Sequence, residues 1–481
     1  MKLDQILSVR LSRVMQPSMS SFRIALLTLV IVLAATGANA DACSSHSNFK
    51  SIYDFGDTTG DPLSPTYVGV ISQGRDGNLW STAPVGGSGG GGAFRLTPGG
   101  KLTAYDFAST AGQPYSGLTL GTDGNFYGTT FNGGTSKAGT VFKLTPKGVL
   151  TPLYSFTGGN DGKIPLAPPI EGTDGNFYGT TDEGGAHNFG TVYKITRSGK
   201  LTTMYQFDGS HGSNPVGALV QGTDGNLYGT TVSGGASNWG AIFEITPSGT
   251  FTLVYSFDFT HGGNPYADLV QGSDGNFYGA TNVGGSSRVG VVFKITPKGA
   301  LTVLYSLNGS TDGANPWGLV QATDGNFYGV ATNAGNGYGT IFRITSKGKF
   351  TVCEDFNATL GANGRVTLVQ HTNGTLYGDT TAGGDLVNTG VFYSLNLGFK
   401  PFVSLLPPSG KTGATVGILG QGFTGTTAVS FNGTAATQFK VVSKTYLTAV
   451  VPTGATTGFV TVTTPGGTLM SNKKFRIKTL D

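Results

Sequence analysis

A short phrase that recurs along the chain constrains its fold more than any other feature. Residues 219–231 read LVQGTDGNLYGTT, and close variants of this phrase occur seven times. Its turn residue returns every 47 to 51 positions, as Asp76, Asp123, Asp174, Asp224, Asp274, Asp324 and Asn373. A repeat of this length, without a helical period, indicates stacked supersecondary units.

Each repeat contains four short apolar and β-branched runs separated by Gly, Asp and Pro. In the fourth repeat they cover residues 218–221, 226–231, 240–246 and 250–257. Such runs predict strands, and the Asp-Gly and TPSG segments between them predict hairpin turns. Four-stranded units repeated radially are typical of a β-propeller, which leaves only short sheet edges exposed.

The two ends of the repeat region are offset by one strand. The seventh repeat has its first three strands but lacks the fourth, whereas residues 49–55, FKSIYDF, match a fourth strand and precede the first repeat. An N-terminal strand that completes the last unit would close a ring. The sequence therefore predicts a seven-bladed propeller over residues 41–398, closed by strand 49–55.

The carboxylate of the recurring Asp-Gly turn could bind a metal, act as an acid or base, or shape the turn. Catalysis needs such a group once or twice, but this one appears six times and is replaced by Asn373 in the seventh copy. Asp tolerates a left-handed backbone and Gly supplies positive φ, so we interpret the pair as a turn former. Calcium stays an alternative, although each turn offers one carboxylate and calcium usually gathers several acidic oxygens.

Three further positions of the repeat carry recurring side chains. Two aromatic sets are predicted to fill the core between sheets: Trp80, Tyr127, Tyr178, Tyr228, Tyr278, Tyr328 and Tyr377, and Phe94, Phe142, Phe243, Phe293, Phe342 and Phe392. At the end of the first strand stand Gln73, Leu120, Glu171, Gln221, Gln271, Gln321 and Gln370. The amides of this last set either line the axial channel or hydrogen-bond neighbouring strands.

The N-terminus has the features of an export signal. Residues 1–40 combine a basic leader, the apolar run IALLTLVIVLAA and a small-residue site ending at Ala40. We expect cleavage after Ala40, no membrane span in the mature chain, and a secreted or cell-surface location, with the periplasm as an alternative. Translation could also begin at Met15 or Met19.

Cysteines and charge add two expectations. Cys43 and Cys353 are the two cysteines of the chain, and they could pair in an oxidising compartment. The formal charge of +4 includes no long basic run, so nucleic acid is not an expected partner. We expect a monomer.

After residue 398 the pattern changes to short alternating strands with Gly, Pro and Thr turns, which predicts a small β-sandwich over residues 399–481. The segments PPSGKTGATVGILGQGF, VSFNGTAA and LTAVVPTGATTGFVTVTTPGG resemble the IPT/TIG immunoglobulin-like family. That resemblance implies a spacer or interaction domain. The predicted fold class is thus all-β: a seven-bladed β-propeller followed by an immunoglobulin-like sandwich.

The repeat region resembles the Gloeo/Verruco-type (GloVer) tandem repeat through DGNFYGTT, the following GG and GTVFKITPKG. The resemblance covers residues 49–398, with a divergent first copy. It implies an exported bacterial protein whose repeats accompany surface-attachment modules. It implies no established reaction and supplies no catalytic residues.

The variable loops are the expected binding region. The connections after the second strand of each repeat vary most, and rigid scaffolds with variable loops usually bind through those loops. Aromatic residues occupy equivalent positions there and have polar neighbours: Phe189, Trp239 and Tyr338, with His187, Asn188, Asn238 and Arg288. An aromatic face with amides beside it suits a sugar. Alternatively, these aromatics cap their own blades.

The sequence favours a non-catalytic binding or adhesion protein for extracellular polysaccharide or cell-surface glycan. One alternative is a secreted glycan-active hydrolase or lyase, with acids that depart from the repeat as candidates: Glu171, Asp182, Glu183, Asp268, Asp379 and Asp385. A structural surface scaffold is the other. The GGSGG and GSGGGG segments lack the helix that a nucleophile elbow or dinucleotide site requires. No His or Cys spacing indicates zinc, and no cofactor is expected.

Overall fold

The computed structural model describes Cys43 and residues 49–56, 60–65, 70–87, 89–108, 111–333, 337–384 and 389–478. Every regular element in these ranges is a strand, so the described part of the chain is all-β. The expected signal peptide, residues 1–40, and the candidate acid Asp385 lie outside these ranges. Both Cys43 and Cys353 are disulfide-bonded.

The fourth repeat illustrates how the sequence forms a sheet. Its strands β16 (Val220–Gln221), β17 (Leu227–Thr231), β18 (Ala241–Ile245) and β19 (Phe251–Ser256) pair antiparallel in chain order. Between β16 and β17, Asp224 Oδ1 accepts the backbone N–H of Asn226 at 3.1 Å, and Gly225 has φ +94°. The turn interpretation of this Asp is therefore confirmed.

The same carboxylate also anchors a core side chain. Asp224 Oδ2 accepts the hydroxyl of Tyr228, which is 1% exposed, at 2.6 Å. Burial, followed by the hydrogen bond to Asp224, raises the pKa of Tyr228. The turn thus satisfies the one polar group of an otherwise apolar buried ring.

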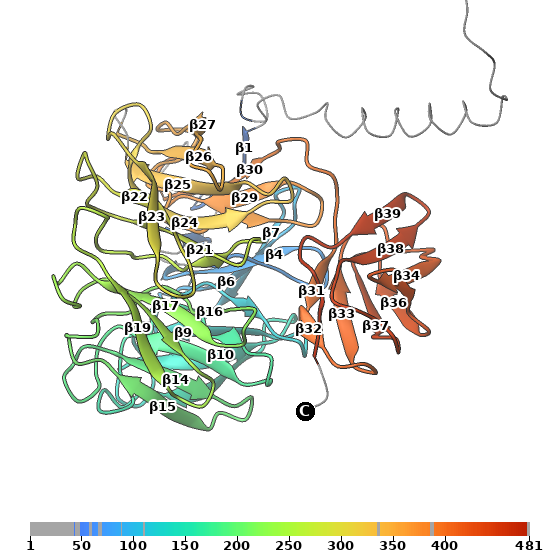
Figure 1. Ribbon diagram of the computed structural model, residues 1–481, viewed down its shortest axis with the longest axis horizontal. Coiled ribbons are helices and arrows are strands. Elements are labelled where there is room, and N and C mark those ends of the chain that lie inside the picture. The colour runs from blue at the N-terminus through green and yellow to red at the C-terminus, as the bar shows by residue number, and fades with distance from the viewer. Residues whose placement is uncertain are drawn as a thin grey trace, which may run out of the picture. The chain divides into compact units, whose positions relative to one another are not determined.

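Among the described residues, seven sheets of this four-stranded kind lie between Phe49 and Leu395 (Figure 1). The other six are β3 (Ser72–Gln73), β4 (Leu79–Ala83), β6 (Gly92–Leu96), β7 (Leu102–Asp106); β8 (Thr119–Leu120), β9 (Phe126–Thr130), β10 (Thr140–Leu144), β11 (Leu150–Ser155); β12 (Ile170–Glu171), β13 (Phe177–Thr181), β14 (Thr191–Ile195), β15 (Leu201–Gln206); β20 (Val270–Gln271), β21 (Phe277–Thr281), β22 (Val291–Ile295), β23 (Leu301–Ser306); β24 (Ala314–Gln321), β25 (Phe327–Asn333), β26 (Thr340–Ile344), β27 (Phe350–Asp355); and β28 (Val369–Gln370), β29 (Leu376–Asp379), β30 (Val391–Leu395), β1 (Phe49–Asp54). A small two-stranded sheet joins β2 (Pro62–Leu63) to β5 (Val85–Gly86). Repeated sheets of this kind form a β-propeller.

The last sheet takes its fourth strand from the N-terminal end of the repeat region. Strand β1 pairs antiparallel with β30, with Phe49 opposite Leu395 and Asp54 opposite Val391. The apolar side chain of Phe55, which follows β1, packs with Phe94 of the first repeat and Phe392 of the last. The first and last repeats therefore share a core.

The first-strand Gln positions link neighbouring sheets. In six of the seven sheets the residue at this position is Gln or Glu, and its side-chain oxygen accepts a backbone N–H from the preceding sheet at 2.6–2.9 Å. The donor is the residue two places after the corresponding position in that preceding sheet. The donor and acceptor pairs are Thr122 and Glu171, Thr173 and Gln221, Thr223 and Gln271, Ser273 and Gln321, Thr323 and Gln370, and Thr372 and Gln73. Of the two interpretations of these side chains, hydrogen bonding to neighbouring strands is thus the observed one.

The exception lies between the first two sheets, because the side chain of Leu120 has no oxygen that could accept a hydrogen bond. There Arg75 Nη2 instead donates to Thr122 O at 2.6 Å. With that bond every sheet is joined to the next, and the last is joined to the first.

The predicted core aromatics are confirmed. None of the thirteen side chains in the two sets is more than 3% exposed. Rings from successive sheets pack in contact, as in the pairs Tyr228–Phe277 at 4.2 Å and Tyr278–Phe327 at 3.9 Å between centroids. Burying one such side chain contributes about 1.5–3 kcal/mol, so the repeated aromatics stabilise the packing between neighbouring sheets.

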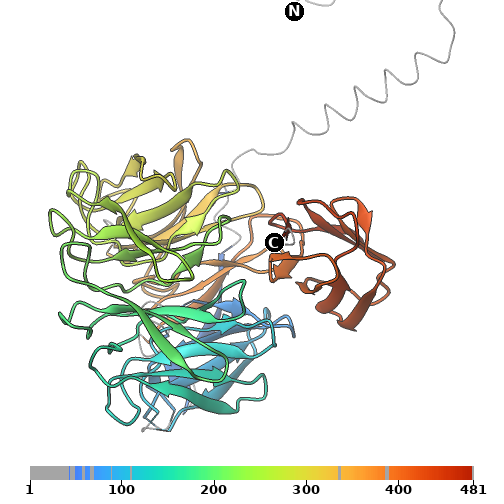
Figure 2. The same ribbon diagram turned by 60° about the horizontal axis from the view of Figure 1, so that its bottom comes forward.

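A second compact region follows the last repeat and is drawn in orange to red in Figures 1 and 2. Its strands form two four-stranded sheets and one parallel pair: β31 (Ser404–Leu406), β33 (Thr415–Leu419), β37 (Tyr446–Val450), β36 (Phe439–Ser443); β35 (Thr434–Ala435), β34 (Ala428–Phe431), β38 (Val460–Thr464), β39 (Gly467–Met470); and β32 (Ser409–Gly410), β40 (Arg476–Ile477). One apolar cluster draws on both sheets, including Ile418 and Leu447 from one and Phe431 and Val462 from the other. The two sheets therefore enclose a common core.

Candidate functional site

The loops that join the second and third strands of each repeat hold the polar site residues predicted from the sequence. Asn188 and Asn238 both have φ +59°, and their Oδ1 atoms accept the N–H groups of Gly184 and Gly234 at 3.2 and 2.9 Å. Asn tolerates this left-handed conformation better than most residues. The two amides therefore shape their own loops, although both residues are exposed.

The remaining polar site residues lie in the same type of loop. Arg288 occupies the left-handed position of the fifth repeat with φ +64°, and its side chain is exposed. His187, beside Asn188 in the third repeat, is also exposed. The structure thus places these residues in equivalent loops of three successive repeats.

The three predicted aromatic side chains follow the left-handed position. Phe189 is 39% exposed and its ring lies against Gly209 of the following connection. Trp239 is half-buried and packs on Phe259, with ring centroids 4.4 Å apart. Tyr338, in the sixth repeat, is half-buried too. Each of the three rings is thus partly covered and leaves part of its surface in solvent.

Phe259 is the functional candidate that the sequence reasoning missed. Its φ is +69°, whereas the equivalent connections of three other repeats carry glycine: Gly158, Gly209 and Gly309, with φ of +83°, +84° and +80°. A bulky residue in this region costs roughly 1–2 kcal/mol relative to glycine. The available signal was an aromatic residue where the sister repeats have glycine, directly after a strand.

Two Asp–His pairs lie in the connections that lead into the fourth and fifth repeats. Nδ1 of His211 lies 2.8 Å from Oδ2 of Asp208, and Nδ1 of His261 lies 2.8 Å from Oδ2 of Asp258. Partial burial alone would raise the pKa of Asp208, but hydrogen bonds from the backbone and ring of His211 lower it to about 2. Both imidazole rings are about half exposed, at 47% and 51%. The pairs thus hold two oriented imidazoles at the surface: the ring of His211 lies 6.2 Å from that of Phe251, and His261 follows Phe259 by two residues.

Most of the candidate catalytic acids have separate structural partners. Glu183 forms an ion pair with Lys163 at 2.9 Å, and Asp268 accepts the hydroxyl of Thr367 at 2.8 Å. Burial raises the pKa of Asp268, and it raises the pKa of Asp182 to about 6. Asp379 is fully buried beside Tyr393.

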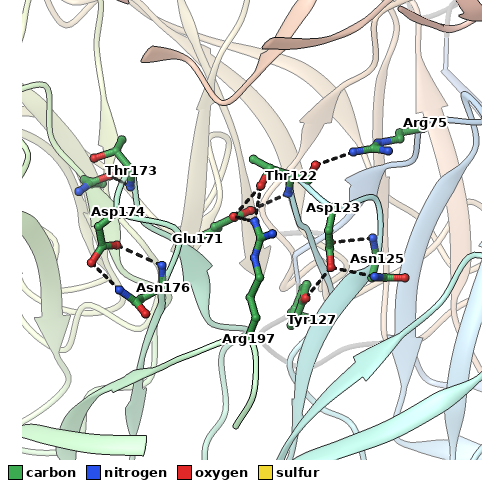
Figure 3. A network of polar contacts seen from close by, with 11 residues as sticks. Arg75, Thr122, Asp123, Asn125, Tyr127, Glu171, Thr173, Asp174, Asn176 and Arg197 are labelled. Carbon is green, nitrogen blue, oxygen red and sulfur yellow. Dashed lines mark hydrogen bonds and ion pairs between the residues drawn. The ribbon is translucent and has the colours of Figure 1, made fainter. Parts of the chain in front are cut away.

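Glu171, the remaining candidate acid, belongs to the network in Figure 3. Its Oε2 accepts the Thr122 N–H at 2.6 Å, and its Oε1 accepts the Thr122 hydroxyl at 2.7 Å. Nη2 of Arg197 donates to both Glu171 Oε1 and the Thr122 hydroxyl. The Glu171 side chain is 8% exposed and the Arg197 side chain is 41% exposed. The carboxylate is therefore fully occupied, and the guanidinium is the solvent-facing member of the pair.

Neither a metal cluster nor a spanning helix occurs in the described ranges. No three His, Cys, Asp or Glu side chains there come together as ligands for an ion. No helix in the same ranges is long and apolar enough to cross a membrane.

Comparison with solved structures gives distant likenesses. The extracellular domain of the hybrid two-component system protein BT3049 from B. thetaiotaomicron is 13% identical with a TM-score of 0.49; 88% of this chain is covered, but only 57% of that one. XC5397, a gluconolactonase from Xanthomonas campestris, is 12% identical with a TM-score of 0.40 and coverage of 70% and 99%. The PQQ-bound aldose sugar dehydrogenase from Streptomyces coelicolor is 15% identical with a TM-score of 0.38 and coverage of 72% and 97%.

The sequence comparison is more informative. No curated protein matches the chain. Residues 65–272 and 220–440, which together span most of the chain, match the Gloeobacter/Verrucomicrobia repeat. The protein therefore belongs to the Gloeobacter/Verrucomicrobia repeat family.

Proposed function

We propose that the protein is exported and acts, as a monomer, as a non-catalytic binding protein for extracellular polysaccharide or cell-surface glycan. The basic, apolar and small-residue order of residues 1–40 supports export. The separate structural partners of Glu171, Glu183 and Asp268 favour binding over hydrolysis. Its place of action would be the cell surface or the medium.

The architecture that we propose for this role is a closed seven-bladed propeller, residues 41–398, followed by an IPT/TIG immunoglobulin-like domain, residues 399–481. Closure is supported by the pairing of β1 with β30 and by the hydrogen bond from Thr372 N to Gln73. The common core of the two C-terminal sheets is compatible with an immunoglobulin-like sandwich. In this proposal the ring presents its loops and the second domain acts as a spacer or interaction module.

One observation carries the proposal: the contact between Trp239 and Phe259. These two residues lie on the loop face, by which we mean the connections between the second and third strands of each repeat together with the connections between repeats. Phe259 keeps a backbone conformation that glycine adopts in sister repeats, so its ring is retained at an energetic cost. Strain of this kind concentrates at functional sites. Two partly exposed rings, with His261 and Asp258 beside them, offer an apolar platform and hydrogen-bonding groups, which is what a sugar ring requires.

The test compares polysaccharide binding and melting temperature for Trp239→Ala and Phe189→Ala, with Val289→Ala as the matched control. Val289 fills the equivalent position in the fifth repeat without an aromatic ring. We expect Trp239→Ala to weaken binding by about 2 kcal/mol, since a few aromatic anchors carry most of an interface. Val289→Ala should leave binding unchanged. A lowered melting temperature with undiminished binding in Trp239→Ala would show that the ring only caps its blade.

A further inference from the structure

The C-terminal domain contacts the propeller on the side of the Asp-Gly turns through specific bonds. Thr445 Oγ1 donates to Arg75 O at 2.8 Å, and the guanidinium of Arg75 lies 4.4 Å from the centroid of the Tyr446 ring. Gln421 Nε2 donates to the Thr372 hydroxyl at 2.9 Å. These contacts fall on the first and last repeats.

Residues that depart from the repeat gather where this contact is made. Leu120 stands where most repeats have Gln, and it joins an apolar cluster with Leu419 and Tyr446 of the C-terminal domain. Arg75 stands where most repeats have Thr or Ser, and it stacks on Tyr446. Docking of the second domain accounts for both departures.

Glu171 and Arg197 also depart from the repeat, but docking and folding do not explain them. Gln221 makes the same link to the preceding sheet that Glu171 makes, so the fold does not require a carboxylate there. At the turn position of Arg197, four other repeats have proline, as in Pro247. Glu171 and Arg197, two residues that differ from the repeat and lie 26 positions apart in the sequence, thus form one ion pair.

This ion pair lines a cavity of about 400 Å³ between the two regions. Small-molecule sites commonly occupy roughly 300–1,000 Å³. The propeller contributes Glu171, Arg197 and Thr173, and the C-terminal domain contributes Pro407, Thr415 and Tyr446. The site is therefore composite and has hydroxyl groups, a guanidinium and an apolar wall.

We propose that this cavity binds the carboxylate of a sugar acid, such as a uronate unit, through Arg197. The Glu171 oxygens are taken up by Thr122 and Arg197, so Glu171 acts as a positioning residue that orients the guanidinium. Arg presents a planar fork that matches a carboxylate. Lys478 adds positive charge, because its Nζ donates to the carbonyl oxygen of the lining residue Thr173 at 3.1 Å.

The ligand class combines two arguments. The preference for an anion comes from the solvent-facing guanidinium of Arg197, whereas the choice of a sugar rests on the proposed glycan-binding function. The Thr and Tyr hydroxyls suit a polyhydroxylated compound, and Pro407 offers an apolar surface to its ring. A free uronic acid and a uronate unit of a polysaccharide would share this chemistry.

The experiment is calorimetric titration of the mature protein with glucuronate, galacturonate and an acidic disaccharide, with glucose as the neutral probe. The test variant is Glu171→Gln/Arg197→Pro, which restores the residues of the fourth repeat. Its matched control is Gln221→Glu/Pro247→Arg, which installs the same pair away from the cavity. Glu171→Gln can still accept the Thr122 N–H, so we expect the test variant to fold, as its melting temperature will report.

We expect glucuronate or galacturonate to bind and glucose not to bind. In the test variant, affinity should fall about tenfold or more, the effect of losing a charge-assisted hydrogen bond, and the control should bind normally. No uronate binding, equal binding of glucose, or undiminished binding in the folded test variant would each overturn the proposal. The loop-face proposal is tested separately, by the polysaccharide binding of Trp239→Ala against Val289→Ala, so its failure can be distinguished from a failure of uronate titration.

Discussion

At Phe259 we expect substitution by glycine to be less destabilising than substitution by alanine, which reverses the usual order. At most half-buried positions, replacing Phe by Ala costs less than replacing it by Gly, because glycine adds conformational entropy to the unfolded chain. At φ +69° the folded state instead penalises every residue with a Cβ. We therefore expect Phe259→Gly to be more stable than Phe259→Ala.

The magnitude follows from the backbone and the ring contact. Both variants lose the Phe259–Trp239 contact at 4.4 Å, worth about 0.5–1.5 kcal/mol beyond burial. Alanine also keeps the left-handed penalty of roughly 1–2 kcal/mol, whereas glycine removes it and adds about 0.4–1 kcal/mol of unfolded-state entropy. The free energy of unfolding should thus be about 0.5–1 kcal/mol higher for Phe259→Gly than for Phe259→Ala.

The assay is urea denaturation of the two variants and the wild type, compared through midpoints at equal slope. Gly209→Ala, at φ +84° in the sister connection, measures the cost of adding a Cβ where the wild type has none. If Phe259→Ala is as stable as Phe259→Gly while Gly209→Ala is strongly destabilising, the backbone of Phe259 is not strained. Backbone strain would then not mark Phe259 as a functional position.

Three further predictions concern the scaffold. Asp224→Asn should cost less than about 1 kcal/mol and leave binding unchanged, because Asn373 already bonds Tyr377 at the equivalent turn; a large loss or a metal dependence would contradict the turn assignment. Burial raises the pKa of Asp182 to about 6 from its usual 3.8, so ionisation of Asp182 destabilises the folded state progressively as the pH rises between these values. Asp182→Asn should therefore raise the free energy of unfolding by up to about 3 kcal/mol at pH 8 and change it little at pH 3.5. Equal effects at the two pH values would refute this. Deleting residues 41–56 removes β1 and should lower the melting temperature sharply. The control is deletion of residues 41–48, which also removes Cys43 but keeps β1. Equal melting temperatures of the two deletion variants would refute closure by β1.

Much of the fold follows from the repeat itself. Asp-Gly turns, the buried Tyr and Phe positions and the pairing of strand 49–54 with the last repeat could be predicted because each depends on local turn chemistry or on a fixed period. The interpretation of the Gln positions as inter-sheet links could be offered only as one of two alternatives, because the sequence does not say whether an amide points to the axis or to a neighbour.

The site was less predictable because it depends on departures from the repeat. The left-handed backbone of Asn188 and Asn238 turns their amides inward to their own loops, which no spacing indicates. Phe259 has a positive φ and packs on Trp239, a contact between two separate connections of the chain. Glu171 ends the first strand of its repeat, and Arg197 lies in the turn after the third strand. Their ion pair depends on how the strands align in the sheet, which the sequence alone does not show.

The most direct test of the central claim, that the loop face binds glycan, is a glycan array probed with the mature protein and with Trp239→Ala. The account predicts that the mature protein binds a subset of extracellular polysaccharides, and that Trp239→Ala loses this signal while its melting temperature stays within a few degrees of the wild type. Absence of any glycan signal from the mature protein, or an undiminished signal from Trp239→Ala, would contradict it.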